Sequence, residues 1–133
     1  MERTLVILKP DTVERKLVGE IIARFEKKNL EITRIEMVVI DKNTAEEHYA
    51  HVKNEPIYED MIGFITSGPA VVMVLEGNQA IQTVRSMVGR TSSFDSPSGT
   101  IRGDYSSHRF RNLIHASDSA ESAEIEINRF FKH

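Results

Sequence analysis

The sequence contains no cysteine among its 133 residues, which excludes one kind of cross-link and one kind of chemistry. No disulfide can form, no thiolate can act as a nucleophile, and a zinc site would have to use histidines and carboxylates. The N-terminal region also lacks a long apolar run, because only Leu5 to Leu8 are consecutive apolar residues there. Such a run is too short for the apolar core of a signal peptide or for a membrane span. We therefore expect a cytoplasmic protein with no membrane partner.

Two glycine-rich phosphate-binding loops are missing as well. Neither Gly-x-x-x-x-Gly-Lys nor Gly-x-Gly-x-x-Gly occurs in the chain, so a phosphate chain would have to be held by side chains. The formal net charge of minus 3 argues against a general nucleic-acid surface. One segment differs: Gln79 to His115 holds five arginines and two aspartates, a net charge of plus 3, which leaves minus 6 for the remainder. This segment favours the binding of a small polyanion.

Hydrophobic patterns predict a single domain, 1–133, built from strands and helices. Apolar or alternating runs predict four strands, at 5–8, 35–39, 70–75 and 113–114. Helical spacing of apolar residues predicts helices at 18–25, 81–88 and 120–130, and two short helices within 44–65 that are suited to forming a lid. This order predicts an α+β, ferredoxin-like sandwich, with a four-stranded antiparallel sheet and helices covering one face.

Capping residues predict where the helices begin. A capping box places an acidic or amide side chain three residues after the cap, and three pairs have this spacing: Asp11 with Glu14, Thr44 with Glu47, and Asp118 with Glu121. Asn78 is expected to cap the helix at 81–88, and Gly89 to end it. The segment 90–100 has no periodicity, and a loop of this length in a compact domain is usually functional.

One histidine, His115, lies between the end of a predicted strand and the start of a predicted helix. In that helix, Glu126 is placed to return toward the junction and orient either the imidazole of His115 or the hydroxyl of Ser117. A third group of this kind is typical of an activated nucleophile. The local pattern alone nevertheless favours a partly buried structural histidine. A second pair, His48 and His51, has a spacing that suits two metal ligands, but no third ligand is identifiable, so we predict a solvated helix face.

The segment Asn112-Leu-Ile-His115-Ala-Ser117-Asp118-Ser119 resembles the active-site signature of the nucleoside diphosphate kinases. Further segments resemble motifs of the same family: Lys9-Pro10-Asp11, Phe64-Ile-Thr-Ser-Gly-Pro69 and Gly99-Thr-Ile-Arg102-Gly-Asp104. The resemblance runs from Thr4 to Phe131. Several ordered motifs at family spacing are far more specific than one histidine.

This resemblance implies an enzyme that transfers the γ-phosphoryl group of a nucleoside triphosphate, such as ATP, to a nucleoside diphosphate. Transfer would run in two half-reactions through a phosphohistidine at His115, with Mg²⁺ held mainly by the nucleotide phosphates and not directly by the protein. Ser117 and Glu126 would orient His115, and Tyr49 would support the site. The residues implied to contact the nucleotide are Lys9, Arg85, Thr91, Arg102 and Asn112. The family also implies a homo-oligomer, usually a hexamer and sometimes a tetramer.

The sequence departs from the family pattern at three sites. Ile57 occupies the base-clamp position, where an aromatic residue usually stacks on the nucleotide base, and a β-branched side chain can pack on a base but cannot stack. Ser92-Ser93-Phe94 replaces the usual Asn-Pro after Thr91, and Ser98 replaces a proline that commonly precedes Gly99. We expect weaker base binding and a changed packing of a loop that often supports subunit contacts in the family.

Two other functions fit the same residues. One is a histidine phosphocarrier that passes its phosphate to a protein, and the other is a non-catalytic module that binds a nucleotide or RNA. RNA-recognition domains share the predicted order of elements, but they need aromatic residues on the central strands after a basic residue and glycine. Here Arg102-Gly103 is followed by Asp104, and the strand 70–75 has no aromatic residue. No specific nucleic-acid partner is therefore expected.

Overall fold

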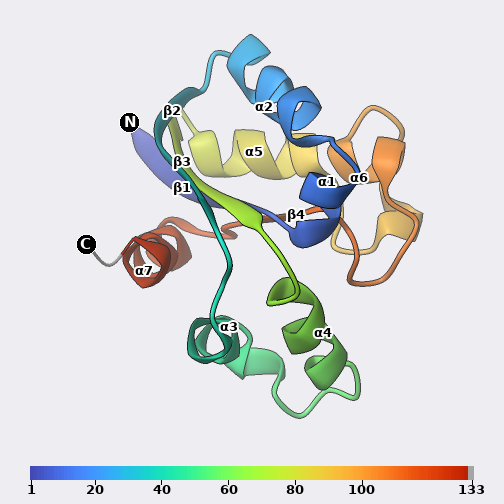
Figure 1. Ribbon diagram of the computed structural model, residues 1–133. Coiled ribbons are helices and arrows are strands. Elements are labelled where there is room, and N and C mark those ends of the chain that lie inside the picture. The colour runs from blue at the N-terminus through green and yellow to red at the C-terminus, as the bar shows by residue number, and fades with distance from the viewer. Residues whose placement is uncertain (132–133) are drawn as a thin grey trace.

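The computed structural model describes residues 1–131, and a four-stranded sheet forms its centre (Figure 1). The strands are β1 (Glu2–Leu8), β2 (Glu31–Val38), β3 (Ala70–Gly77) and β4 (Ile114–Ala116). Their order across the sheet is β2-β3-β1-β4, and every neighbouring pair is antiparallel. The predicted four-stranded antiparallel sheet is confirmed, and the two apolar runs form its central strands.

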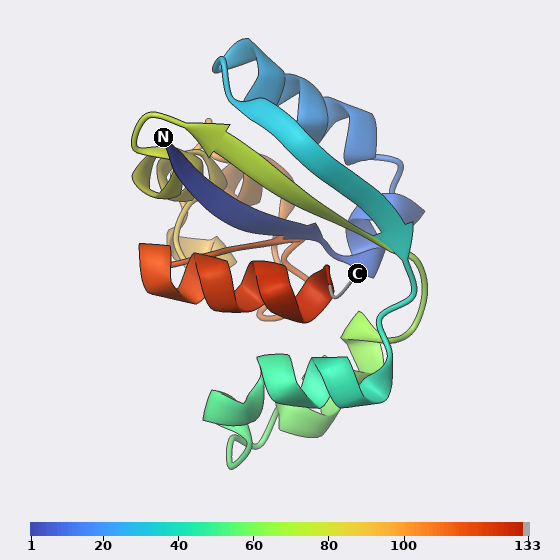
Figure 2. The ribbon, with the colours of Figure 1, turned by 90° about the vertical axis from the view of Figure 1, so that its left-hand side faces the viewer.

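Helices cover both faces of this sheet, so the prediction of one covered face is wrong (Figure 2). The helices are α1 (Pro10–Glu14), α2 (Val18–Lys27), α3 (Lys42–His48), α4 (Tyr58–Ile65), α5 (Ala80–Val88), α6 (Ile101–Tyr105) and α7 (Ala120–Phe130), with 3-10 turns at Ala50–Val52 and Ser93–Asp95. One core lies between the sheet and α2, α5 and α6, and a second lies between the sheet and α3, α4 and α7.

The central strand β1 explains why both faces need cover. Val6 and Leu8 belong to the first core, whereas Leu5 and Ile7 belong to the second, because successive side chains of a strand point to opposite faces. All four side chains are buried. Burying each of them contributes about 1.5–3 kcal/mol, so a sheet with an uncovered face would lose several such terms. No helix in the described part of the chain is both long enough and apolar enough to cross a membrane.

Two helix starts differ from the predicted capping boxes. α3 is capped by Asp41, whose Oδ1 accepts a hydrogen bond from the amide of Thr44 at 2.8 Å. α7 is capped by Ser119, whose hydroxyl oxygen accepts from the amide of Ser122 at 3.0 Å, and not by Asp118. Each predicted box has a second candidate cap nearby, and the path of the incoming chain decides which side chain reaches the free N–H groups.

The chain also turns differently before α5 and after α1. Gln79, not Asn78, precedes α5, and it has a left-handed backbone with φ of 51°. Gly89 ends α5 with φ of 101°, as predicted. The capping box at Asp11 predicts one helix that continues through 18–25, but the chain forms two helices there, α1 and α2, because Lys16 between them has φ of 60°.

Asp11 was predicted to cap a helix, but it holds a strained residue near the end of the chain instead. Leu113, just before β4, has φ of 76°, which is costly for a residue other than glycine. Its amide donates to Oδ2 of Asp11 at 3.1 Å. Its carbonyl accepts from the amide of Lys9 at 2.8 Å and from the hydroxyl of Thr12 at 2.6 Å. The start of α1 therefore fixes the backbone two residues before His115.

Candidate functional site

A cleft of about 430 Å³ is lined by the end of β1, by β4, α5, α6 and α7, and by the α3–α4 pair. Nine of the ten residues predicted for the site line it: Lys9, Tyr49, Ile57, Arg85, Thr91, Arg102, Asn112, His115 and Glu126. The tenth, Ser117, is fully buried and contacts Glu126. Residues from five separate regions of the sequence thus meet in one cleft.

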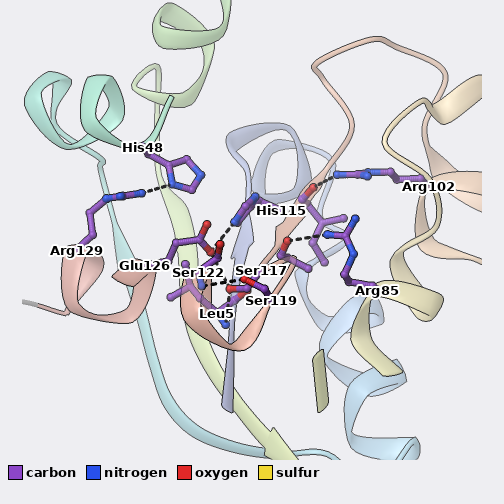
Figure 3. A network of polar contacts seen from close by, with 12 residues as sticks. Leu5, His48, Arg85, Arg102, His115, Ser117, Ser119, Ser122, Glu126 and Arg129 are labelled. Atoms are coloured by element: carbon purple, nitrogen blue, oxygen red, sulfur yellow. Dashed lines mark hydrogen bonds and ion pairs between the residues drawn. The ribbon is translucent and has the colours of Figure 1, made fainter. Parts of the chain in front are cut away.

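His115 lies in the middle of β4, with Glu126 of α7 beside it (Figure 3). Nε2 of His115 is 2.9 Å from Oε1 of Glu126, and the hydroxyl of Ser117 donates to the same oxygen at 2.7 Å. Burial alone would raise the pKa of Glu126, but the hydrogen bonds from His115 and Ser117 outweigh burial and lower that pKa below its ordinary value. The sequence left open which of the two groups Glu126 contacts, and it contacts both.

The hydrogen bond to Glu126 determines which nitrogen of His115 has a free lone pair. An ionised carboxylate only accepts hydrogen bonds, so Nε2 of His115 carries the hydrogen. A neutral imidazole then has its lone pair on the other nitrogen, Nδ1. The side chain of His115 is 24% exposed, so a ligand in the cleft can reach it.

A buried lysine, Lys9, lies at the end of β1. Its Nζ donates to Oδ1 of Asn112 at 2.8 Å, and the residue is 6% exposed. Burial lowers the pKa of Lys9 to about 7; the charge of Arg102 acts in the same direction and that of Asp11 opposes it. The charged form of Lys9 has little neighbouring negative charge to stabilise it in the free protein. A bound anion would therefore stabilise this cation.

Two arginines complete the positive side of the cleft. Burial and the charge of Arg85 lower the pKa of Arg102 to about 10. Arg85 donates to the carbonyl of Ala116 at 3.3 Å. Arg102 donates to three backbone carbonyls, those of Arg90, Asn112 and Ile114. The resemblance implied only a nucleotide contact for Arg102, whereas its hydrogen bonds also hold the segment that leads to His115.

The rim of the cleft is partly apolar. Ile57 and Met61 line it from the start of α4, and Phe110 lines it from the loop before β4. Tyr49 is buried, and burial raises the pKa of its hydroxyl to about 12, so it stays a neutral hydrogen-bond donor. Thr91 is exposed at the start of the loop after α5. The sequence did not point to Phe110, because it lies in an irregular segment without periodicity.

His48 was predicted to lie on a solvated face, and this prediction is wrong. The residue is buried, and its ring centroid is 4.6 Å from that of His115, with the two rings nearly perpendicular. Arg129 donates to Nδ1 of His48 at 2.9 Å. Burial, with the neighbouring charges of His115 and Arg129, lowers the pKa of His48 to about 2. His51 is exposed, as predicted.

Within residues 1–131, His48, His115 and Glu126 form one group with metal-ligating atoms within 4.8 Å of one another. Their hydrogen bonds do not suit a metal ion. Arg129 occupies the lone pair of Nδ1 of His48, so Nε2 of that ring keeps its hydrogen. Nε2 of His115 carries a hydrogen directed at Glu126. A metal ion held through Nε2 of both rings would have to displace both hydrogens, and we therefore assign none to this group.

The family model of nucleoside diphosphate kinase matches residues 2–133. The chain belongs to the nucleoside diphosphate kinase family. A nucleoside diphosphate kinase of Acetivibrio thermocellus is 70% identical over 131 residues, which are 98% of this chain and 96% of that protein. One of Sulfurisphaera tokodaii is 51% identical over 99% of this chain and 90% of that protein.

Solved structures of this kinase family have the same fold. The nucleoside diphosphate kinase of Encephalitozoon cuniculi superimposes with a TM-score of 0.97 at 37% identity, over 100% of this chain and 90% of that one. The enzyme of Halobacterium salinarum in complex with CDP gives a TM-score of 0.96 at 43% identity, over 99% and 88% of the two chains. The ferredoxin-like sandwich is thereby confirmed. As a nucleoside diphosphate kinase, the protein transfers a phosphoryl group from a nucleoside triphosphate to a nucleoside diphosphate.

Proposed function

We propose that the kinase works by a ping-pong mechanism in which His115 is the residue that becomes phosphorylated. One observation carries this proposal: Glu126 binds Nε2 of His115 at 2.9 Å, in a cleft lined by Lys9, Arg85 and Arg102. This contact leaves Nδ1 as the nucleophilic nitrogen. A covalent intermediate divides a difficult transfer into two easier steps.

In the first step the lone pair of Nδ1 attacks the γ-phosphorus of the nucleoside triphosphate. A P–N bond forms, the bond to the bridging oxygen breaks, and the nucleoside diphosphate leaves with that bond's electron pair. The ring becomes a phosphoimidazole that keeps the hydrogen on Nε2 and its hydrogen bond to Glu126. The carboxylate therefore offsets the positive charge that develops on the ring. In the second step a terminal phosphate oxygen of another nucleoside diphosphate attacks the same phosphorus, the P–N bond breaks, and neutral His115 is restored.

The cations and polar groups of the cleft would hold the phosphate chain. Guanidinium groups offer paired donors to phosphate oxygens, and a lysine adds a compact charge. We assign this role to Lys9, Arg85 and Arg102, with Thr91 at the rim. Asn112 would reach the ribose, and Tyr49 would support the site; both line the cleft.

Mg²⁺ fits this cleft as a partner of the nucleotide. Mg²⁺ prefers oxygen ligands, keeps several waters and is usually bound through phosphates and one or two carboxylates. Of the carboxylates that line the cleft, Glu126 is already bound to His115 and Ser117, which leaves Asp118 and Glu55 at the rim. The nucleotide phosphates would therefore provide most of the ligands of the ion, and Asp118 is the rim carboxylate that would assist them. When bound, Mg²⁺ neutralises negative charge on the phosphates.

Base recognition is expected to be weak. Ile57, Met61 and Phe110 offer apolar contact at the rim, but Ile57 cannot stack on a base as an aromatic residue would. Weak base contacts together with strong phosphate contacts favour acceptance of many bases, with ribose or deoxyribose.

An exposed apolar patch and a separate exposed aromatic side chain support a homo-oligomer larger than a dimer. Ile35, Met37 and Val39 are 48%, 61% and 64% exposed on β2 or just after it, at the free edge of the sheet. An exposed apolar edge strand is a site for pairing with another chain. Phe94, in the loop after α5, is a single aromatic side chain that is 70% exposed, and it marks a second contact point away from this edge. Two separate interfaces permit a closed assembly such as a hexamer or a tetramer. A cytoplasmic location stays a prediction.

The proposed mechanism is tested by mixing the protein with Mg²⁺ and ATP labelled at the γ-phosphate, and then adding unlabelled CDP. We expect a label on the protein that is stable in alkali and lost in acid, and its rapid movement to CTP. A label that does not move to CDP would favour the phosphocarrier, and the absence of any label would favour a binding module. Either result would contradict the ping-pong mechanism.

Nucleotide binding is expected to weaken as the pH rises above about 7. Bound phosphates raise the pKa of an ammonium group, so binding retains or takes up a proton on Lys9, whose pKa is about 7 in the free protein. The affinity for ADP should fall by up to about tenfold per pH unit above this value, until the pKa of the complex is reached. Calorimetry at pH 7.5 to 9 in two buffers of different ionisation enthalpy measures the affinity and the proton uptake.

The matched control for this experiment is Lys9→Met, which keeps the length of the side chain and removes the titrating group. This variant should bind ADP more weakly at pH 7.5 and show a flatter dependence on pH. An affinity of the native protein that does not change between pH 7.5 and 9, without proton uptake, would show that Lys9 is already charged in the free protein.

A further inference from the structure

A partly buried arginine contacts the ring that packs against the proposed nucleophile. The side chain of Arg129, in α7, is 13% exposed, and its Nη1 donates to Nδ1 of His48 at 2.9 Å. The ring of His48 meets that of His115 edge to face, with centroids 4.6 Å apart. Arg129, His48 and His115 therefore form a continuous line of contacts from α7, through the end of α3, to β4 (Figure 3).

Packing alone does not account for an arginine at this position. Nε of Arg129 has no hydrogen-bond partner within residues 1–131, and the carboxylate of Glu47, 3.8 Å away, is 57% exposed. A buried charged group with an incomplete set of partners costs free energy, and an apolar side chain of similar length would cover the same surface at a lower cost. A role outside stability would explain the residue.

The contact with Arg129 fixes the chemical state of His48. A guanidinium group can only donate, so Nδ1 of His48 accepts and its ring hydrogen is on Nε2. The groups that face this ring are His115 on β4, Arg129 on α7, Lys9 after β1 and His51 beyond α3, and together with burial they keep it neutral. A neutral His48 does not compete with His115 for the negative charge of Glu126, although all three lie close together.

The orientation of the His115 ring depends on more than its hydrogen bond to Glu126. Over the described residues its one hydrogen bond is that of Nε2 with Glu126, and a single hydrogen bond leaves a ring free to pivot. A perpendicular ring packed against it restricts that motion. The ring of His48 is itself held between Tyr49 and Phe130, at centroid distances of 4.9 and 5.3 Å.

We propose that Arg129 and His48 are a positioning pair for the phosphorylated histidine. Arg129 locks the ring of His48 in one tautomer and orientation, and His48 keeps His115 aligned with Glu126. This role rests on the proposed phosphorylation of His115. It assigns an effect on transfer to Arg129, which does not line the cleft, because a displacement of about 1 Å at a reacting group can cost about 10²-fold in rate.

Three variants test the pair: Arg129→Met, His48→Phe and the double variant. Arg129→Lys is the matched control, because it keeps a positive charge and a donor. Transfer from ATP to CDP gives kcat and KM, single-turnover labelling gives the rate of phosphorylation, and melting curves establish a temperature at which every variant is folded. We expect Arg129→Met and His48→Phe each to lower kcat and the phosphorylation rate by about 10- to 100-fold, with KM changed by less than about threefold. Arg129→Lys should recover most of the rate.

The double variant and the ring tautomer distinguish positioning from a structural role. Because Arg129 acts through His48, the double variant should be no slower than His48→Phe. Proton–nitrogen spectra of the histidine rings should show His48 with its hydrogen on Nε2 in the native protein, and a mixture of tautomers in Arg129→Met.

Several outcomes would reject the positioning pair. They are an unchanged phosphorylation rate in Arg129→Met, losses confined to KM or to the melting temperature, or losses in the two single variants that multiply in the double variant. These results are distinguishable from a failure of the proposed function. If the native protein and Arg129→Met form the phosphohistidine at residue 115 at the same rate, only the positioning pair is wrong. If no phosphohistidine forms at residue 115 in the native protein, the ping-pong mechanism is wrong.

Discussion

Replacement of His115 by alanine is expected to remove the phosphorylated intermediate and nearly all transfer activity. No labelled protein should form from γ-labelled ATP, and the rate of transfer to CDP should fall by about 10⁴- to 10⁶-fold, as is found when an enzyme loses its covalent nucleophile. The reason is that Glu126, Ser117 and the cations can still hold a nucleotide but cannot accept its phosphoryl group. The measurement combines acid-labile labelling with steady-state transfer.

The structure offers a matched control for this variant. His51 is an exposed histidine that lines the same cleft, and it is not bonded to Glu126. His51→Ala should keep the label and the transfer rate within about twofold of the native protein, as expected for a surface substitution. Nucleotide binding by His115→Ala, measured by calorimetry, should persist, because the phosphate-binding side chains remain. A label that survives in His115→Ala would place the phosphoryl group on another residue.

The contact between His115 and Glu126 could be predicted from the sequence because the two residues lie on consecutive elements of secondary structure. His115 lies in the short strand β4 and Glu126 lies on α7, the helix that follows, so a short chain segment brings them together. The central strands were equally visible, because they are buried on both faces and consist of apolar runs. Elements with strong local patterns and neighbours close in sequence were therefore predicted correctly.

Contacts between distant elements were not predictable in this way. His48 lies in a mostly polar helix, and only the packing of α3 against β4 and α7 buries it. The helix α6 has five residues, too few to show a period of 3.6, so only its resemblance to a family motif could be seen in the sequence. The hydrogen bonds of Arg102 to backbone carbonyls likewise depend on the three-dimensional path of the chain.

Local sequence preferences also did not determine which residue caps α7. Both Asp118 and Ser119 can cap α7, and both precede it directly. Ser119 has the cap, while Asp118 stays at the rim of the cleft beside the proposed phosphate site. The residue with the better capping box is thus not the cap, and hydrogen bonds from the side chains of Ser122 and Ser119 lower the pKa of its carboxylate instead, which local preference alone would not indicate.

Replacement of Gly103 by alanine is expected to have the largest effect on stability of the changes considered. A Cβ atom on Gly103, in α6, would lie 1.9 Å from the carbonyl oxygen of Pro97 and 2.7 Å from the hydroxyl oxygen of Thr100. Real contacts of this kind do not fall below 3.0 Å, and the nearest atom belongs to the backbone, so the turn before α6 or the helix itself must move. Overpacking of this severity should lower the free energy of unfolding by about 3 kcal/mol or more.

The same movement should reach the active site. Arg102 is next to Gly103, and its guanidinium holds the backbone on either side of Leu113. A displaced α6 would weaken these hydrogen bonds and shift the segment before His115, so kcat/KM for transfer should fall by at least about tenfold. Urea unfolding and steady-state transfer measure the two effects.

Gly63→Ala is the matched control, because Gly63 also lies in a helix, α4, but a Cβ atom there meets nothing within 4 Å. Alanine is favoured over glycine in a helix, so this variant should be more stable than the native protein by about 0.5–1 kcal/mol. If the free energy of unfolding falls in Gly103→Ala and rises in Gly63→Ala, close packing of the turn at 97–100, and not helix propensity, determines the result at Gly103. A loss of less than about 1 kcal/mol in Gly103→Ala would mean that this turn can relax away from α6 without disturbing Arg102.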